Sequence, residues 1–314
     1  TGGSVRNPAS FCSTVGYKPT YGLISRYGLI SYANSIEQIG PLTRTVKDTA
    51  FMLNLIAGLD PNDSTTVNNN NEDYLANIDS GIEGKKIGII TEMIGDGIDP
   101  EVMTATKEAI SKLEGLGAIC EEVSLEMVKY SVAAYYTITA TEAGSNLARY
   151  DNLRYGYDLP VEGYEFNSYI SKARKNFGPE VTRRMIIGGF VPSAGHAGKY
   201  FLKAMKVKSK LTKEINEAFK KFDLLIAPTV PILPFKIGEK IDDPVSLFLV
   251  DINTVTANLT GKPAISIPFK IVNGLPIGIQ LLANSMNDKL LLQAAHALEQ
   301  TVTLPEVPIW QKLV

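Results

Sequence analysis

Apolar and polar positions alternate at helical spacing most clearly between Thr45 and Gly58. Thr45 and Asp48 have the spacing of a capping box, and Gly58 stands where a helix ends on a left-handed residue. The polar stretch Asp60–Asn71 then predicts an exposed loop, which could take an insertion or serve as a linker. We therefore predict a helix over 45–58 whose buried face consists of Val46, Ala50, Leu53 and Ala57.

A strand, a helix and a second strand are predicted next. Lys86–Ile90 is a short apolar run, and Asp99 followed by Pro100 supplies an N-cap and a proline at the first helical position. Ala118–Val123 has the pattern of the second strand, so this order predicts an α/β unit with parallel pairing. The buried face of the helix would consist of Val102, Ala109, Ile110, Leu113 and Leu116.

The remainder of the chain alternates between amphipathic helices and buried strands. No internal repeat is present, which excludes a solenoid. The predicted helices are Leu211–Phe222 and Leu290–Leu298, and the predicted strands are Leu224–Ala227, Ala264–Pro268 and Ile277–Leu282.

Composition indicates a folded protein with a large core. Of the 314 residues, 45% are hydrophobic and 20% are charged, which suits one large domain or two smaller ones. Lys and Arg number 31 against 33 Asp and Glu, so the net charge is −2 and the pI is about 5.8. This balance gives no broad basic surface for a phosphate backbone, so a nucleic acid contact would be local or supplied by a partner.

Cysteine usage and the apolar runs bear on the compartment. Cys12 and Cys120 have neither CxxC spacing nor a framework of several pairs around them, which points to a reducing compartment. No apolar run reaches the roughly 18 to 20 residues that span a bilayer, and no signal-peptide pattern opens the chain. We therefore expect a soluble, cytoplasmic protein without a membrane contact.

The run Thr1-Gly2-Gly3-Ser4 contains the elements of an acyl-transfer site. Its glycines let the backbone approach a substrate, with amide hydrogens facing a developing oxyanion beside a hydroxyl. An ordinary turn is the alternative for these four residues alone, whereas a P-loop is excluded because no Gly-Lys-Ser/Thr follows. A serine also requires a base, and of the two histidines His296 lies in an apolar helical pattern and His196 in a glycine-rich turn. A Ser-His-Asp triad through His196 therefore stays open.

Several long segments carry specific motifs, beginning with TGGSVRNPASFCSTVGYKPTYGLISRYGL (1–29) and its continuation ISYANSIEQIGPLTRTVKDTA. The first resembles the second half of the amidase signature, and the continuation resembles the A subunits of the tRNA-dependent amidotransferases. The resemblance covers nearly the whole chain and is weakest in the asparagine-rich loop. Further matching segments are EAGSNLARYDNLRYGY (142–157), TRRMIIGG (182–189), the pair Asp242-Asp243 before Pro244, and NLTGKPAISIP (258–268).

The resemblance to the amidase-signature family implies an acyl-transfer site around Ser4. Ser4 matches the family's nucleophile, the backbone amides of Thr1, Gly2, Gly3 and Ser4 match its oxyanion hole, and Arg6 matches a supporting arginine. The family's base is a serine in a cis peptide relayed to a lysine, and both belong to motifs that precede the GGS segment. Because neither motif is present, we expect an N-terminally truncated portion of a longer polypeptide that is inactive alone, with a separate chain supplying the base as the alternative.

The resemblance also implies a site for glutamine. Arg184 matches the arginine that binds the α-carboxylate, Asp251 matches the aspartate that binds the α-ammonium, and Tyr135 lines the same pocket. Without the family context, Arg183 and Arg184 would be a surface basic pair and Asp251 a helix N-cap. His196 departs from the family pattern, which leaves its role open.

The family's fold is α/β, with a mixed, largely parallel central sheet flanked by helices, and the resemblance assigns 1–314 to one such domain that lacks N-terminal elements. It implies glutamine hydrolysis that supplies ammonia to a B subunit, which uses ATP and Mg²⁺ to amidate Glu-tRNA(Gln) or Asp-tRNA(Asn), with a C subunit joining the two. No cofactor or metal is expected in this chain. Two alternatives are a stand-alone amidase acting on a small or aryl amide, which Arg184 and Asp251 disfavour, and a non-catalytic fragment that only binds a partner.

Overall fold

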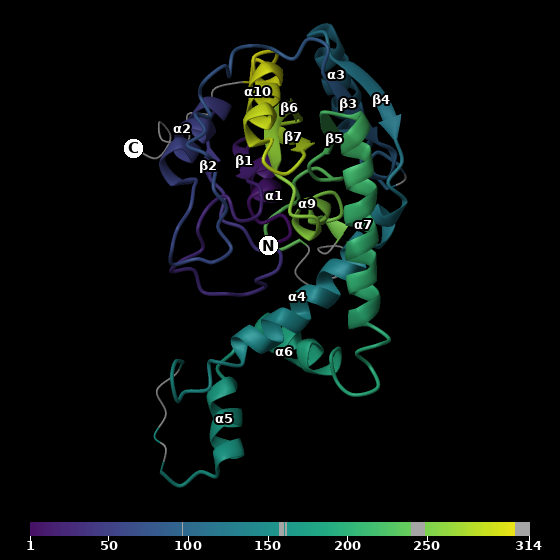
Figure 1. Cartoon of the computed structure of the whole chain (residues 1–314). Coiled ribbons are helices and arrows are strands. Elements are labelled where there is room, and N and C mark those ends of the chain that lie inside the picture. Colours follow the sequence, from purple (N-terminus) through teal and green to yellow (C-terminus); the bar gives the residue numbers. More distant parts are fainter. Residues whose placement is uncertain (96, 157–159, 161, 240–248, 305–314) are drawn as a thin grey trace, which may run out of the picture.

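One mixed sheet organises the protein, as seen in a computed structural model that describes residues 1–304 except 96, 157–159, 161 and 240–248 (Figure 1). Within these residues, seven strands follow the order β2-β1-β6-β7-β5-β3-β4. The pairs β5–β3 and β3–β4 are parallel, and the four other neighbouring pairs are antiparallel. The strands are β1 (Val15–Lys18), β2 (Leu42–Thr43), β3 (Lys86–Ile90), β4 (Ile119–Val123), β5 (Leu224–Pro228), β6 (Ala264–Val272) and β7 (Leu275–Ala283).

The α/β class and the mixed sheet are confirmed, but the expectation of a largely parallel sheet is wrong for the described strands. Asn273 and Gly274 join β6 directly to β7, and both have positive φ, at 52° and 82°. A two-residue Asn-Gly turn with this conformation produces an antiparallel hairpin. The direction of pairing in the middle of the sheet therefore follows from this turn and not from the hydrophobic pattern of the strands.

Helices cover both faces of the sheet. Along β5, Leu224 and Ile226 belong to one apolar cluster and Leu225 and Ala227 to another, because successive strand residues point to opposite faces. The first cluster includes residues of α2 (Val46–Ile56), α3 (Pro100–Gly115) and α10 (Asp288–Glu299). The second includes residues of α4 (Ser131–Leu147), α7 (Phe201–Lys221) and α9 (Val255–Leu259).

Other helices are short or project from the body. The helix α1 (Arg6–Phe11) packs against β1, β6 and β7, so the start of the chain lies against the middle of the sheet. In Figure 1, α6 (Pro179–Phe190) runs along α4, and α5 (Phe166–Arg174) lies far from the sheet. Two 3-10 turns, η1 (Thr91–Met93) and η2 (Glu126–Tyr130), follow β3 and β4.

Most of the predicted elements are confirmed. Thr45 caps α2 through a capping box with Asp48, and Gly58 has a φ of +137°. The unit β3-α3-β4 has the predicted parallel pairing, and Asp99 caps α3. The helix α7 starts at Phe201 rather than Leu211, because its first half carries a run of lysines that hides the apolar periodicity.

The polar stretch after α2 lies against the segment that contains Ser25 and Arg26. Asp60 accepts a hydrogen bond from Ser25 Oγ at 2.6 Å, and Asp63 accepts one from the backbone N–H of Arg26 at 2.8 Å. The family-like pair Asp242-Asp243 lies outside the described residues. In the part of the chain that the structure describes, no helix is long and apolar enough to cross a membrane.

Candidate active site

The loop that contains Ser4 leaves its amide groups free. The carbonyl oxygen of Gly2 accepts a bond from Arg6 Nη2 at 3.5 Å, and that of Gly3 accepts one from Asn7 N at 2.7 Å. In a trans peptide the N–H points opposite to the carbonyl, so the amides of Gly3 and Ser4 face away from these partners. Among the described residues, the N–H groups of Gly2, Gly3 and Ser4 have no protein acceptor. Three free donors therefore lie beside the exposed hydroxyl of Ser4.

Both glycines of this loop are required by close contacts. A Cβ at Gly2 would overlap the phenol of Tyr135, and a Cβ at Gly3 would overlap the side chains of Thr254 and Asn7. Tyr135 belongs to α4 and Thr254 directly precedes α9. The sequence GGS therefore fits a backbone that is pressed against two helices, which an ordinary exposed turn would not require.

Arg6 lies buried beneath the loop, with only neutral oxygens as hydrogen-bond acceptors. Its Nη1 donates to Gln280 Oε1 at 2.6 Å and its Nη2 to Asn258 Oδ1 at 2.5 Å, in addition to the Gly2 carbonyl. Burial lowers the pKa of Arg6 to about 9, against the opposing effect of Asp251. The geometry suits the supporting role predicted for Arg6, because its bonds fix the loop and do not reach the Ser4 hydroxyl.

Asp251 has its side chain directed at the same loop. Its Oδ1 accepts from Asn7 Nδ2 at 2.6 Å, and its Oδ2 accepts from the hydroxyl of Tyr136 at 2.9 Å. The interpretation of Asp251 as a helix N-cap is wrong, because the N-cap of α9 is Thr254, three residues later. Burial raises the pKa of Asp251, while these two hydrogen bonds and Arg6 oppose the shift.

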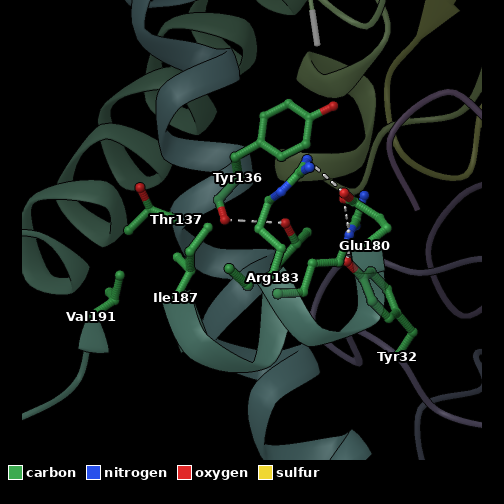
Figure 2. Close-up of a pocket in the computed structure, with 10 residues that line it drawn as sticks. Tyr32, Tyr136, Thr137, Glu180, Arg183, Ile187 and Val191 are labelled. Carbon is green, nitrogen blue, oxygen red and sulfur yellow. Dashed lines mark hydrogen bonds and ion pairs between the residues drawn. The ribbon is translucent and has the colours of Figure 1, made fainter. Parts of the chain in front are cut away.

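A pocket of about 150 Å³ lies between α4 and α6, where Figure 2 labels Tyr136 and Glu180 in its lining. Arg184 belongs to the same lining. Its Nε donates to Glu180 Oε1 at 2.8 Å, and its Nη1 donates to the hydroxyl of Tyr32. Glu180 also pairs with Arg183 at 2.7 Å, whose side chain is 45% exposed against 27% for Arg184. Both arginines line the pocket, and Arg184 is the more buried of the two.

Two adjacent tyrosines of α4 connect these parts of the site. Tyr135 packs under Gly2, and Tyr136 bonds Asp251 and also lines the pocket of Arg184. Their rings meet edge to face with centroids 4.9 Å apart. The sequence motifs identify Tyr135 and Arg6 but do not identify Tyr136 and Asn7, which follow them directly in the chain. Tyr135 itself supports the loop, and the described lining of the pocket contains Tyr136 in its place.

Neither histidine contacts Ser4 in the described residues. His196 follows α6, where its Nδ1 lies 3.4 Å from Ser193 Oγ and its ring packs on Phe190. His296 is buried in α10, with its Nε2 3.0 Å from Asp79. No group of three or more His, Cys, Asp or Glu among the described residues is placed to hold a metal ion.

Comparison with protein families identifies the kind of chain to which this site belongs. The Amidase family profile matches residues 1–292. The chain belongs to the amidase family. The glutamyl-tRNA(Gln) amidotransferase A subunit of Cenarchaeum symbiosum is 65% identical over 311 residues, which cover 99% of this chain and 65% of that protein. Its counterpart in Methanosarcina mazei is 48% identical, with 96% of this chain and 63% of that protein covered. The chain therefore spans just under two thirds of the length of these relatives.

Solved structures agree with the fold. The glutamyl-tRNA(Gln) amidotransferase A subunit of Thermotoga maritima superimposes with a TM-score of 0.79 at 43% identity, covering 98% of this protein and 62% of that chain. A 6-aminohexanoate cyclic dimer hydrolase superimposes with a TM-score of 0.76 at 28% identity, covering 96% of this protein and 63% of that chain. The mixed sheet with helices on both faces is thus the architecture of amidase-family structures.

Proposed function

We propose that this amidase hydrolyses the side-chain amide of glutamine with Ser4 as nucleophile. The observation that carries the proposal is the set of three unpaired amide N–H groups beside the Ser4 hydroxyl in a buried Gly-Gly loop. Ser4 Oγ attacks the carbonyl carbon, and the oxyanion accepts hydrogen bonds from the loop amides of Gly2, Gly3 and Ser4, with Thr1 at the edge of the hole. Ammonia leaves, and water then cleaves the glutamyl ester.

The substrate assignment rests on two charged groups near this loop. Asp251 provides an anion for the α-ammonium, and Arg184 provides a guanidinium for the α-carboxylate. Tyr135 and Tyr136 lie on the helix between them, and the pKa of each is raised, first by burial and then by Asp251. A neutral amide substrate would leave Asp251 without a cation, because within the described residues Asp251 accepts only from the uncharged donors Asn7 and Tyr136.

The names of the relatives, which describe subunits of an amidotransferase, support a proposal for the wider reaction. We propose that the released ammonia passes to a B subunit, which uses ATP and Mg²⁺ to amidate Glu-tRNA(Gln) or Asp-tRNA(Asn), while a C subunit joins the two. Binding of tRNA then occurs through the complex. The base that accepts the Ser4 proton is assigned, by the family resemblance, to the serine and lysine that precede the GGS motif in the complete enzyme. The unbridged thiols of Cys12 and Cys120 suit a cytoplasmic setting.

The test is the variant Ser4→Ala in the complete amidotransferase. Removal of the nucleophile should lower glutamine hydrolysis by about a thousandfold or more, because no acyl-enzyme can form. Amidation of charged tRNA with ammonium chloride should be unchanged, since this route bypasses Ser4. The matched control is Ser209→Ala on the exposed face of α7, which should leave both activities intact. Near-normal glutaminase activity in Ser4→Ala would exclude Ser4 as the nucleophile.

A further inference from the structure

Tyr136 is the side chain that contacts Asp251 and also lines the pocket of Arg184. We infer that Tyr136 is the positioning residue of the substrate site: its hydroxyl fixes the Asp251 carboxylate in the direction from which it meets the substrate ammonium. The inference rests on the proposed glutamine site. It adds a residue that the sequence motifs do not single out.

The partners of Asp251 hold it without neutralising it. Asn7 and Tyr136 are uncharged donors, and each occupies one of the two carboxylate oxygens. A carboxylate oxygen accepts about two hydrogen bonds, so each oxygen keeps a lone pair for a further donor. Within the described residues Asp251 forms no ion pair, and the buried guanidinium of Arg6 bonds neutral oxygens instead. The negative charge is therefore held in place and left for the cationic group of a substrate.

Tyr136 is suited to this task by its setting in α4. Its ring is half-buried, packs edge to face on Tyr135 at 4.9 Å, and forms part of the pocket wall. These contacts restrict the ring, so the hydroxyl is held at one position relative to Asp251. Asn7, the other donor, also supports Gly3, so a change there would disturb the nucleophile loop as well. Removing the hydroxyl of Tyr136 is the cleaner perturbation.

The first experiment is Tyr136→Phe in the complete amidotransferase, which keeps the ring and removes one donor to a carboxylate. The glutamine-dependent kcat/KM should fall by about tenfold or more, mainly through KM, because a hydrogen bond to a charged group is lost from the substrate site. Amidation with ammonium chloride should be unchanged in the same preparation. Tyr27→Phe is the control, since the Tyr27 side chain is 70% exposed and remote from the pocket in its described contacts. An equal loss with ammonia would show a structural role and overturn the inference.

A second experiment separates this inference from the proposed function. Asp251→Asn should lower glutamine-dependent activity, and adding Tyr136→Phe to it should have little further effect, because the hydroxyl acts through the carboxylate. Glutaramate, which has the side-chain amide and the carboxylate but no ammonium, should be hydrolysed equally by the Tyr136→Phe and parent enzymes. If Asp251→Asn impairs glutamine use and Tyr136→Phe does not, the positioning role alone is wrong. If neither change affects glutamine use, the glutamine site itself is wrong and the inference falls with it.

Discussion

The buried guanidinium of Arg6 and the partly buried carboxylate of Asp251 do not bond each other. Arg6 donates to amide oxygens of Gln280 and Asn258, and Asp251 accepts from Asn7 and Tyr136. A direct ion pair would satisfy both charges but would leave neither for a substrate. Uncharged partners orient each charge without cancelling it. This arrangement is expected where a ligand or a developing oxyanion supplies the opposite charge.

The pKa of Asp251 leads to a prediction for pH dependence. Binding of the substrate ammonium requires the ionised carboxylate, and burial raises the pKa of Asp251 while Tyr136, Asn7 and Arg6 oppose that rise. Glutamine-dependent kcat/KM should therefore decline on the acid side at a higher pH than the value of about 3.9 for an exposed aspartate. In Tyr136→Phe the decline should move to still higher pH. The measurement is the pH profile of glutaminase activity, and a profile that Tyr136→Phe leaves in place would contradict the prediction.

At the scale of single residues, the sequence identifies the motif residues but not the side chains that bond to them. Ser4, the glycines and Arg6 stand in one motif, so the resemblance assigns them together. Asn7 and Asp251 are 244 residues apart, and Tyr136 and Asp251 are 115 residues apart. No local pattern records such contacts, because they arise only when α1, α4 and the segment before α9 are brought together by the sheet.

Between elements, the packing of α4 on α6 determines the geometry of the proposed glutamine site, because α4 carries Tyr136 and α6 carries Arg184. The two helices meet at Gly144 and Gly188, where a Cβ on Gly188 would overlap the carbonyl oxygen of Ala140. Two glycines allow this close approach of helix backbones. The spacing of the two helices, and so the position of Arg184 relative to Tyr136, depends on them.

Gly188→Ala should therefore push α6 away from α4. We expect a loss of about 1 to 3 kcal/mol in the free energy of unfolding, as for other overpacked contacts, together with a higher KM for glutamine. Gly189→Ala is the matched control, because a Cβ there meets nothing within 4 Å and alanine favours a helix. Urea unfolding and glutaminase kinetics measure the two effects. A Gly188→Ala variant as stable as Gly189→Ala, with unchanged KM, would refute this account.

Elements with strong local signals are predictable from the sequence, and those with weak ones are not. The capping box of α2 and the Asp-Pro start of α3 are local, and both helices form as expected. The first half of α7 and the whole of α4 escape prediction, since α4 packs between α6, α7 and α9 and so lacks one apolar stripe. The direction of β6 against β7 depends on a two-residue turn that the hydrophobic pattern does not report.

Across the whole molecule, Asp288 joins the beginning of the chain to its last described helix. Its carboxylate, only 2% exposed, accepts from the hydroxyl of Tyr17 at 2.6 Å and from both the backbone N–H and the hydroxyl of Thr20. Two oxygens thus satisfy three donors. The segment that follows β1 is thereby fixed to α10 by polar contacts inside the core.

Asp288→Asn should be strongly destabilising, because the amide removes the negative charge that accepts from Tyr17 and Thr20 and that lies near the buried ammonium of Lys18. We expect a loss of about 2 to 4 kcal/mol in the free energy of unfolding. Glu72→Gln is the matched acid-to-amide control, since Glu72 forms an exposed pair with Lys289 at 2.9 Å and should change stability by less than about 1 kcal/mol. Urea midpoints of the two variants test this, and equal midpoints would contradict it.

The sheet order also has a consequence for biosynthesis. The strand β1, which follows the nucleophile loop, pairs with β6, and the acceptors of Arg6 are Asn258 and Gln280. During translation at roughly 5 to 20 residues per second, β6 emerges about 250 residues and some 10 to 50 s after β1. Until then Arg6 lacks both of the side-chain acceptors that hold it beneath the Ser4 loop. The buried shape of the loop is therefore complete only when β6 and β7 have been made.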